Sequence, residues 1–159
     1  MKKKIWMMAA LVAPALVWLA VRWGNSLATP DHELGLTQGR LAPCPDSPNC
    51  VATRAESDEH KIEPLQFTAV PDEAFDRLKR IVAAMSGSRI VTADDDYFHA
   101  EFRSRLLGFV DDVEFRLDDS AGVIHFRSAS RVGHSDLGAN RARMEEIRER
   151  FEGSSKKDR

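Results

Sequence analysis

Apolar and polar residues alternate along three segments in the second half of the chain, and this period of two predicts β-strands with one apolar and one polar face. The segments are YFHAEFRS (97–104), DDVEFRLDD (111–119) and GVIHFRSASR (122–131). A fourth strand is predicted for SRIVTAD (88–94), and the connector DDSAG is typical of a hairpin between the last two strands. We therefore expect four strands in series.

The two faces of these strands differ sharply in chemistry. The apolar face is formed by Phe98, Ala100, Phe102, Val113, Phe115, Leu117, Ile124 and Phe126. The polar face carries Tyr97, His99, Glu101, Arg103, Asp112, Glu114, Arg116, His125 and Arg127. We expect the apolar face to bind the helices and the polar face to be either a solvated surface or a polar concavity for a ligand.

The pairing of the last two strands is limited to two registers, because a slip by one residue would move apolar side chains onto the polar face. One register sets Glu114 opposite His125 and Asp112 opposite Arg127. The other sets Glu114 opposite Arg127 and Arg116 opposite His125. Such cross-strand charge pairs contribute about 0.2 to 1 kcal/mol each.

Two further segments repeat apolar residues at helical spacing. The first, residues 71–87, begins at Pro71 with acidic residues behind it and ends at Gly87. Its buried stripe is expected to be Phe75, Leu78, Val82 and Met85. The second helix is predicted from about Leu137 to Phe151, with Asp136 as N-cap, and its apolar stripe is Leu137, Met144, Ile147 and Phe151.

A short edge strand is predicted in HKIEPLQFT (60–68), since Pro64 disfavours a central position. The order is then β-α-β-β-β-β-α. Strands in series without helical crossovers predict an α+β fold with a mainly antiparallel sheet of about five strands and two helices packed on one face.

The N-terminus is basic and is followed by an uncharged apolar run, Ile5 to Val21, with tryptophans near both ends. This pattern predicts a membrane helix over residues 1–28 that leaves the N-terminus in the cytosol. The expected location is the cell inner membrane, single-pass, with the domain facing the periplasm or the cell exterior. The alternative is a signal peptide cleaved near Ala28, which would release the domain into the periplasm.

The chain has two cysteines, Cys44 and Cys50, and their spacing is not that of a C-x-x-C redox motif. A structural disulfide in an oxidising compartment fits them better than a metal site. We expect it to fix an irregular arm, residues 29–54, against the domain at 55–152. Residues 153–159 are predicted to be a disordered tail.

The composition excludes one class of partner. Residues 1–28 hold four basic side chains and no acidic one, so 19 basic and 25 acidic residues remain in the rest of the chain. A domain with this negative balance repels phosphate backbones, and nucleic acid is not an expected partner. No cofactor and no metal are expected from the motifs.

The polar sheet face and the segment HFRSASRVGHSDLGANRAR (125–143) supply the candidate binding residues. At this strand-to-helix junction, small serines let the helix approach the sheet, and a buried Asn140 needs polar partners such as Ser128 or Ser130. The alternative is a binding role: an anion pocket at the helix N-terminus beside Arg131, His134 and Arg141. The full set of candidate ligand-binding residues is His99, Glu101, Asp112, Glu114, His125, Arg127, Ser128, Ser130, Arg131, His134, Asp136, Asn140 and Arg141.

A loop of unusual composition, RLLGFV (105–110), is apolar where a connection is normally polar. It is interpreted as a continuation of a strand or part of the core. The alternative is that Leu106, Leu107 and Phe109 form an exposed lip that touches a membrane or an apolar ligand.

Several long motifs resemble the domain of unknown function 1499 family. They are LAPCPDSPNCVAT (41–53), HKIEPL (60–65), YFHAEFRSRLLGFVDDVEFRL (97–117) and GVIHFRSASRVGHSDLGANRARMEEIR (122–148). The resemblance implies a small exported or membrane-associated domain, and it implies no catalytic residue.

The function predicted from all of this is a non-catalytic binding module that is attached to the membrane through its N-terminal helix. Its expected ligand is a small anionic, polar or lipid molecule, or an envelope partner. The alternative is a hydrolase or metal-assisted enzyme using His99, Glu101, Glu114, His125 or His134.

Overall fold

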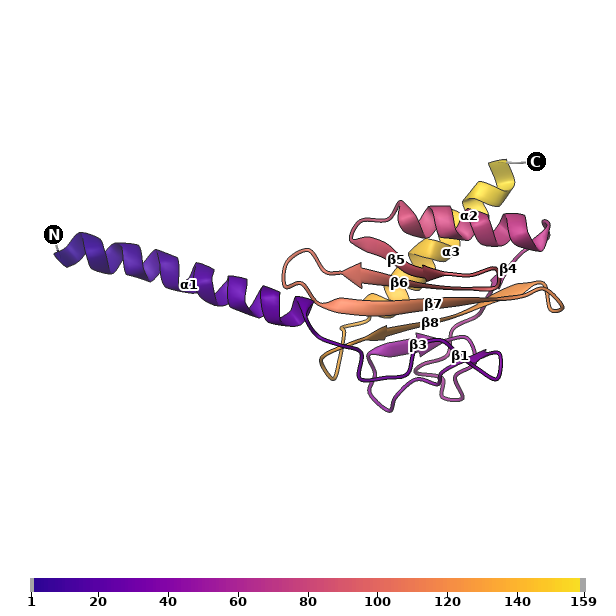
Figure 1. Ribbon diagram of the computed structural model, residues 1–159, viewed down its shortest axis with the longest axis horizontal. Coiled ribbons are helices and arrows are strands. Elements are labelled where there is room, and N and C mark those ends of the chain that lie inside the picture. The colour runs from indigo at the N-terminus through magenta and orange to yellow at the C-terminus, as the bar shows by residue number, and fades with distance from the viewer. Residues whose placement is uncertain (1, 158–159) are drawn as a thin grey trace.

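The computed structural model describes residues 2–157, and its side chains are described for residues 13–154. A long helix, α1 (Lys2–Ser26), precedes the domain and extends away from it as a rod (Figure 1). The domain contains helices α2 (Pro71–Ala83) and α3 (Ala139–Lys157). Its strands are β1 (Leu36–Thr37), β2 (Arg40–Leu41), β3 (Cys50–Ala52), β4 (Leu65–Gln66), β5 (Ser88–Ala93), β6 (Tyr97–Arg103), β7 (Val110–Asp118) and β8 (Val123–Ser130).

The main sheet has six strands within the described residues, and all of its strand pairs are antiparallel. The order is β3-β8-β7-β6-β5, and β4 pairs with the same edge of β8 as β3 does. This confirms the predicted α+β class. The sheet is larger than the expected five strands because β3 comes from residues 29–54, which were predicted to be irregular, while β1 and β2 form a separate small hairpin.

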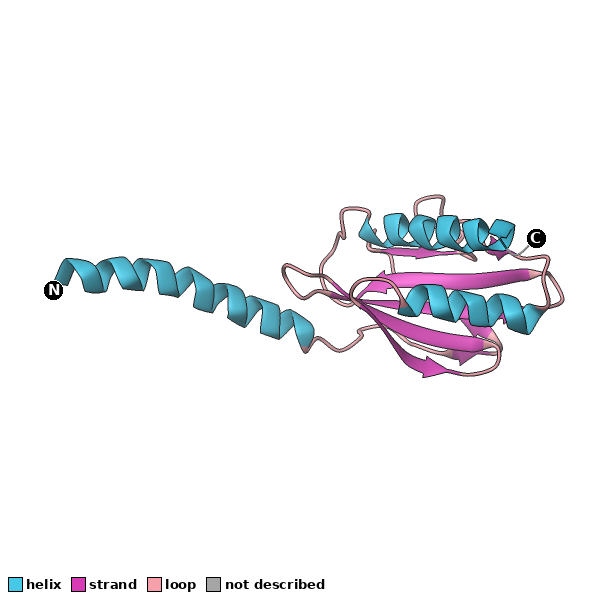
Figure 2. Ribbon diagram, turned by 90° about the horizontal axis from the view of Figure 1, so that it is seen from above, coloured by secondary structure: helices cyan, strands magenta, loops and turns pink. Residues whose placement is uncertain are grey.

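Helices α2 and α3 lie on the same face of the sheet (Figure 2), where they bury the apolar side chains predicted for it. Phe98 stacks on Phe115 with ring centroids 4.5 Å apart and meets Phe75 of α2 edge-on at 5.3 Å. The expected stripe of α2 is buried in this core, as are Met144, Ile147 and Phe151 of α3.

The start of α3 differs from the prediction. Leu137 does not belong to the apolar stripe: it is 96% exposed and adopts a positive φ of 56° in the turn before the helix. Asp136 still caps the helix, because its carboxylate accepts hydrogen bonds from the backbone N–H groups of Gly138 and Asn140. The helix then continues to Lys157 and includes residues 153–157 of the predicted tail; residues 158–159 lie outside the described chain.

The register of the β7–β8 hairpin is the second of the two allowed. Glu114 lies opposite Arg127, and Arg116 lies opposite His125. Tyr97, His99 and Glu101 of β6 face β7 from its other side, with His99 paired to Glu114. His99 and His125 are therefore offset along the sheet as well as separated by β7.

The two remaining sequence expectations have different outcomes. Cys44 and Cys50 form a disulfide with a Cα–Cα distance of 5.7 Å, as predicted. Among the residues that the structure describes, no helix is long and apolar enough to cross a membrane, so the expected membrane helix is not supported.

Candidate functional site

The polar face of the sheet is covered by the N-terminal arm, here residues 28–43, which lies on the side opposite the helices (Figure 1). Three backbone groups of the arm contact it. The carbonyl oxygens of Ala28 and Glu33 accept hydrogen bonds from Arg131 and Arg127, and the N–H of Gly35 donates to Glu114. The middle of the expected surface is therefore closed, and its covered side chains form two groups, whereas Arg103, Arg116 and His125 at its ends stay accessible.

The first group surrounds Asp112, whose side chain is fully buried. Arg131 donates to both carboxylate oxygens at 2.7 and 2.8 Å, and His99 Nε2 lies 2.8 Å from one of them. His32 of the arm approaches the other oxygen at 3.4 Å. Burial alone would raise the pKa of Asp112, but the hydrogen bonds from Arg131 and His99 and the approach of His32 outweigh it and hold that pKa well below its usual value. Arg131 also binds Glu101, so this group joins β6, β7, β8 and the arm.

The second group is an ion pair between Arg127 and Glu114, which are 1% and 0% exposed and 3.1 Å apart. The Tyr97 hydroxyl donates to Glu114 at 2.9 Å. Burial and the neighbouring Glu114 carboxylate raise the pKa of Tyr97, so its hydroxyl stays a donor. The Nε and one terminal nitrogen of Arg127 have no hydrogen-bond partner among the described residues.

A cavity that remains accessible lies beside His125, at the end of the sheet where β7 turns into β8. This His125 cavity has a volume of about 190 Å³ and is lined by side chains of β2, β3, β7, β8 and the turn after β3. Its polar lining consists of Arg40, Thr53, Arg54, Arg116 and His125. At about 30 Å³ per water molecule, the space holds roughly six waters, which suits a phosphate-sized ion or a small carboxylate.

The contacts of His125 define its protonation. Arg54 lies 3.0 Å from His125 Nε2, and because a guanidinium only donates, Nε2 must be the unprotonated acceptor. The proton is then on Nδ1, which lies 3.0 Å from the Thr53 hydroxyl oxygen. Burial and the adjacent Arg54 lower the pKa of His125, with Asp118 acting in the opposite direction, so the neutral ring is favoured.

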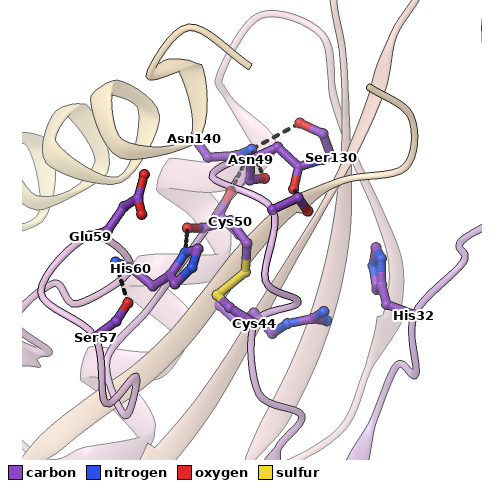
Figure 3. Close-up of a disulfide and its surroundings, with 12 residues drawn as sticks. His32, Cys44, Asn49, Cys50, Ser57, Glu59, His60, Ser130 and Asn140 are labelled. Carbon is purple, nitrogen blue, oxygen red and sulfur yellow. Dashed lines mark hydrogen bonds between the residues drawn. A yellow bond between two sulfur atoms is a disulfide. The ribbon is translucent and has the colours of Figure 1, made fainter. Parts of the chain in front are cut away.

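The strand-to-helix junction forms a buried polar contact on the helix side of the sheet (Figure 3). This agrees with the prediction that a buried Asn140 finds polar partners there. Asn140 accepts a hydrogen bond from Ser128 and donates to Ser130 at 3.0 Å and to the backbone oxygen of Asn49 at 2.9 Å. Arg143 bonds to Ser128 and Asn140 and forms an ion pair with Asp111. These contacts fix α3 to β8 and to the disulfide loop.

The anion pocket expected at the N-terminus of α3 is not assembled. Asp136 occupies the free N–H groups there. Arg141 points to the backbone oxygens of Glu59 and Lys61, at 2.8 and 3.0 Å. His134 is exposed on the loop before the helix. The candidate residues predicted from the sequence are thus divided among the covered sheet face, the helix-side junction and the His125 cavity, while His134 and Arg141 lie apart from all three.

Sequence reasoning missed most of the His125 cavity. Arg40, Thr53 and Arg54 belong to segments without strand periodicity, so no pattern placed them beside β7 and β8. Arg116 was assigned to the polar face but not to a site. The one available signal was its position opposite His125 in the second register.

The comparisons with known proteins identify a family but no activity or ligand. A family model described as "Protein of unknown function (DUF1499)" matches residues 40–151. No curated protein and no solved structure matches the chain.

Proposed function

The chain belongs to the DUF1499 family of proteins of unknown function, and from that premise we propose that its domain binds a small anion in the His125 cavity without catalysing a reaction on it. The observation that supports this best is the charge of the lining. Three guanidinium groups, from Arg40, Arg54 and Arg116, face a cavity that has no carboxylate in its lining.

The guanidinium groups keep unused donors. The Asp118 carboxylate is 3.3 Å from Arg54 and 3.5 Å from Arg116, but the Nε of Arg116 is buried and has no partner among the described residues. Arg40 forms no ion pair with any described residue. Since His125 donates to Thr53, the Thr53 hydroxyl proton is also available to a ligand. An oxyanion would satisfy these donors with charge-assisted hydrogen bonds.

The enzyme alternative receives no comparable support, because its residues do not converge. Glu114 is fully buried and bound by Tyr97, Arg127 and Gly35. His99 is held by Asp112, and His134 lies on a separate exposed loop.

Isothermal titration calorimetry of the full chain with inorganic phosphate, sulfate and succinate at constant ionic strength tests the proposal. We expect saturable binding of at least one of these anions. Because a hydrogen bond to a charged group contributes about 1.5 to 3 kcal/mol, Arg54→Gln and Arg116→Gln should each weaken binding by about 10- to 100-fold.

Arg150→Gln is the matched control, since Arg150 lies half-exposed on α3 in a surface pair with Glu146. It should leave the affinity unchanged. Absence of saturable binding by all three anions, or equal affinities in the wild type and both cavity variants, would contradict the proposal.

We also propose that the domain works outside the cytosol. The Cys44–Cys50 disulfide supports this location, because disulfides persist mainly in oxidising compartments. Maleimide labelling of the protein in intact cells should modify it only after reduction. Labelling of both cysteines without a reductant would refute the expected location.

A further inference from the structure

The end of the domain next to α1 combines a basic cavity with exposed apolar side chains, and we propose that this end binds the surface of an anionic phospholipid bilayer. The surface is formed by the last turns of α1 and by the loops 84–87, 104–109 and 131–138. These loops meet at one end of the sheet, because Arg103 pairs with Val110, and Ser130 pairs with Asp111.

The position of α1 at this end is defined by contacts with the loop 104–109. Arg22 donates to the backbone oxygen of Arg105 at 2.7 Å, and Asn25 donates to that of Leu107 at 3.0 Å. Gly108 has φ 71°, and a Cβ added there would lie 2.8 Å from the backbone oxygen of Arg22. Only glycine allows α1 to approach so closely. The close packing at Gly108 therefore fixes the end of α1 against this loop.

The basic component is a second cavity, the Arg103 cavity, of about 550 Å³. It is lined by Arg22, Arg89, Arg103 and Arg105, with Glu101 as its single carboxylate. Glu101 is already bound by Arg89 and Arg131, and these ion pairs lower its pKa despite its partial burial. The side chains of Arg103 and Arg105 are exposed and form no hydrogen bond or ion pair with described residues, so both guanidinium groups are available to phosphate oxygens.

The apolar component comes from the loop 104–109, from the end of α1 and from the loop before α3. Leu106 in the loop is 68% exposed, Trp23 and Leu27 at the end of α1 are 71% and 65% exposed, and Leu137 in the loop before α3 is 96% exposed. Phe109 adds a partly exposed ring. Large apolar side chains beside guanidinium groups match the boundary between headgroups and acyl chains, where Trp is favoured and Arg binds anionic lipids.

The charge of the rest of the domain favours this orientation. Beyond residue 28, acidic residues outnumber Lys and Arg by 25 to 19. An anionic bilayer therefore repels most of the domain and attracts the end that carries the Arg103 cavity. The proposal also gives a physical role to the apolar residues 105–109 of the segment RLLGFV, which lie outside the strands, whereas Val110 begins β7 and is buried as expected.

Hydrogen exchange of the full chain added to phospholipid nanodiscs tests the proposal. The backbone N–H groups of Arg105, Leu106 and Leu107 form no hydrogen bond within the described residues, so their exchange is fast unless the loop is covered. We expect slower exchange of 105–107 with discs of phosphatidylcholine and phosphatidylglycerol than with discs of phosphatidylcholine alone. Each arginine near an anionic surface contributes about fivefold to binding, so Arg103→Gln with Arg105→Gln should reduce the preference for anionic discs by about thirtyfold.

Two control variants match the chemistry of these changes. Arg80→Gln with Arg150→Gln removes two exposed charges from the helices and should keep the preference. Leu106→Ser should reduce the protection of the loop amides against hydrogen exchange, whereas Val70→Ser, at a 57% exposed site before α2, should not.

Four outcomes would overturn the proposal. They are failure of the chain to associate with either disc, equal exchange of 105–107 with both discs, a full preference for anionic discs in the double arginine variant, and the same protection produced by inorganic phosphate without anionic lipid.

Discussion

Removal of the buried guanidinium by Arg127→Met should destabilise the domain far more than a surface ion pair allows. Arg127 and Glu114 are 1% and 0% exposed because the arm covers them. On an open sheet face such a cross-strand pair contributes about 0.2 to 1 kcal/mol. Breaking a buried pair leaves one charge without its partner and costs about 3 to 5 kcal/mol.

The loss is measured as a change in the free energy of unfolding in urea. The three tryptophans all lie within the first 23 residues, so their fluorescence reports on α1, and far-UV circular dichroism is the better probe of the domain. Glu114→Gln and the double variant complete a double-mutant cycle. We expect the double variant to lose at least about 2 kcal/mol less than the sum of the two single losses, because each single change leaves a buried polar group unpaired.

The exposed pair between Arg150 and Glu146 on α3 supplies the comparison. Arg150→Met should cost no more than about 0.5 kcal/mol, since both side chains are half-exposed and four residues apart in one helix. If Arg127→Met costs less than about 1 kcal/mol, the pair is solvated, and the arm does not lie on the polar face of the sheet.

Three further predictions concern the junction, the disulfide and pH. Asn140→Ala removes the contacts that join α3 to β8 and should cost about 2 to 4 kcal/mol in urea unfolding, while a loss below about 1 kcal/mol would contradict the buried contact. Reduction of Cys44–Cys50 should cost about 2 kcal/mol for so short a loop, and an unchanged melting temperature would show that the loop is ordered without it. Because burial and Arg54 lower the pKa of His125 below its ordinary value near 6.5, the folded state binds fewer protons than the unfolded state as the pH falls past that value. Stability should therefore decrease as the pH is lowered through about 6.5, and His125→Gln, but not His134→Gln, should flatten this decrease in thermal unfolding.

The alternation of residues in 97–131 was enough to predict the strands, the two faces and the α+β class. A period of two determines which side chains share a face, and the structure keeps that division from Phe98 to Phe126, except that Asp111 lies on the helix side, where it binds Arg143. Charge counting left two registers open, and the structure adopts the one that places Arg116 opposite His125. That pairing is tolerated because His125 is neutral, with Arg54 donating to its ring.

Coverage of the polar face was not predictable, because most contacts of the arm with it are made by backbone groups. The groups that contact Arg127, Arg131 and Glu114 are carbonyl oxygens and an N–H of residues 28–35, which carry no side-chain pattern. For the same reason only part of the lining of the His125 cavity could be predicted from the sequence. Its strand residues appeared in the alternation, but Arg40 and Arg54 reach it from segments whose path over the sheet is set by tertiary contacts.

The two proposed sites lie at opposite ends of β7, and this separation makes a last prediction. Val110 starts β7 at the end that carries the Arg103 cavity, and Arg116 lines the His125 cavity six residues further along, about 20 Å away at 3.4 Å per residue. A domain that rests on a bilayer by its first end therefore presents the His125 cavity to the solution. Since sites this far apart share no side chain, their variants should act independently. Arg54→Gln should weaken anion binding and leave the preference for anionic discs intact, and Arg103→Gln with Arg105→Gln should do the reverse. If either change alters both readouts, a single extended basic surface is responsible for both, and the separation of the two sites is wrong.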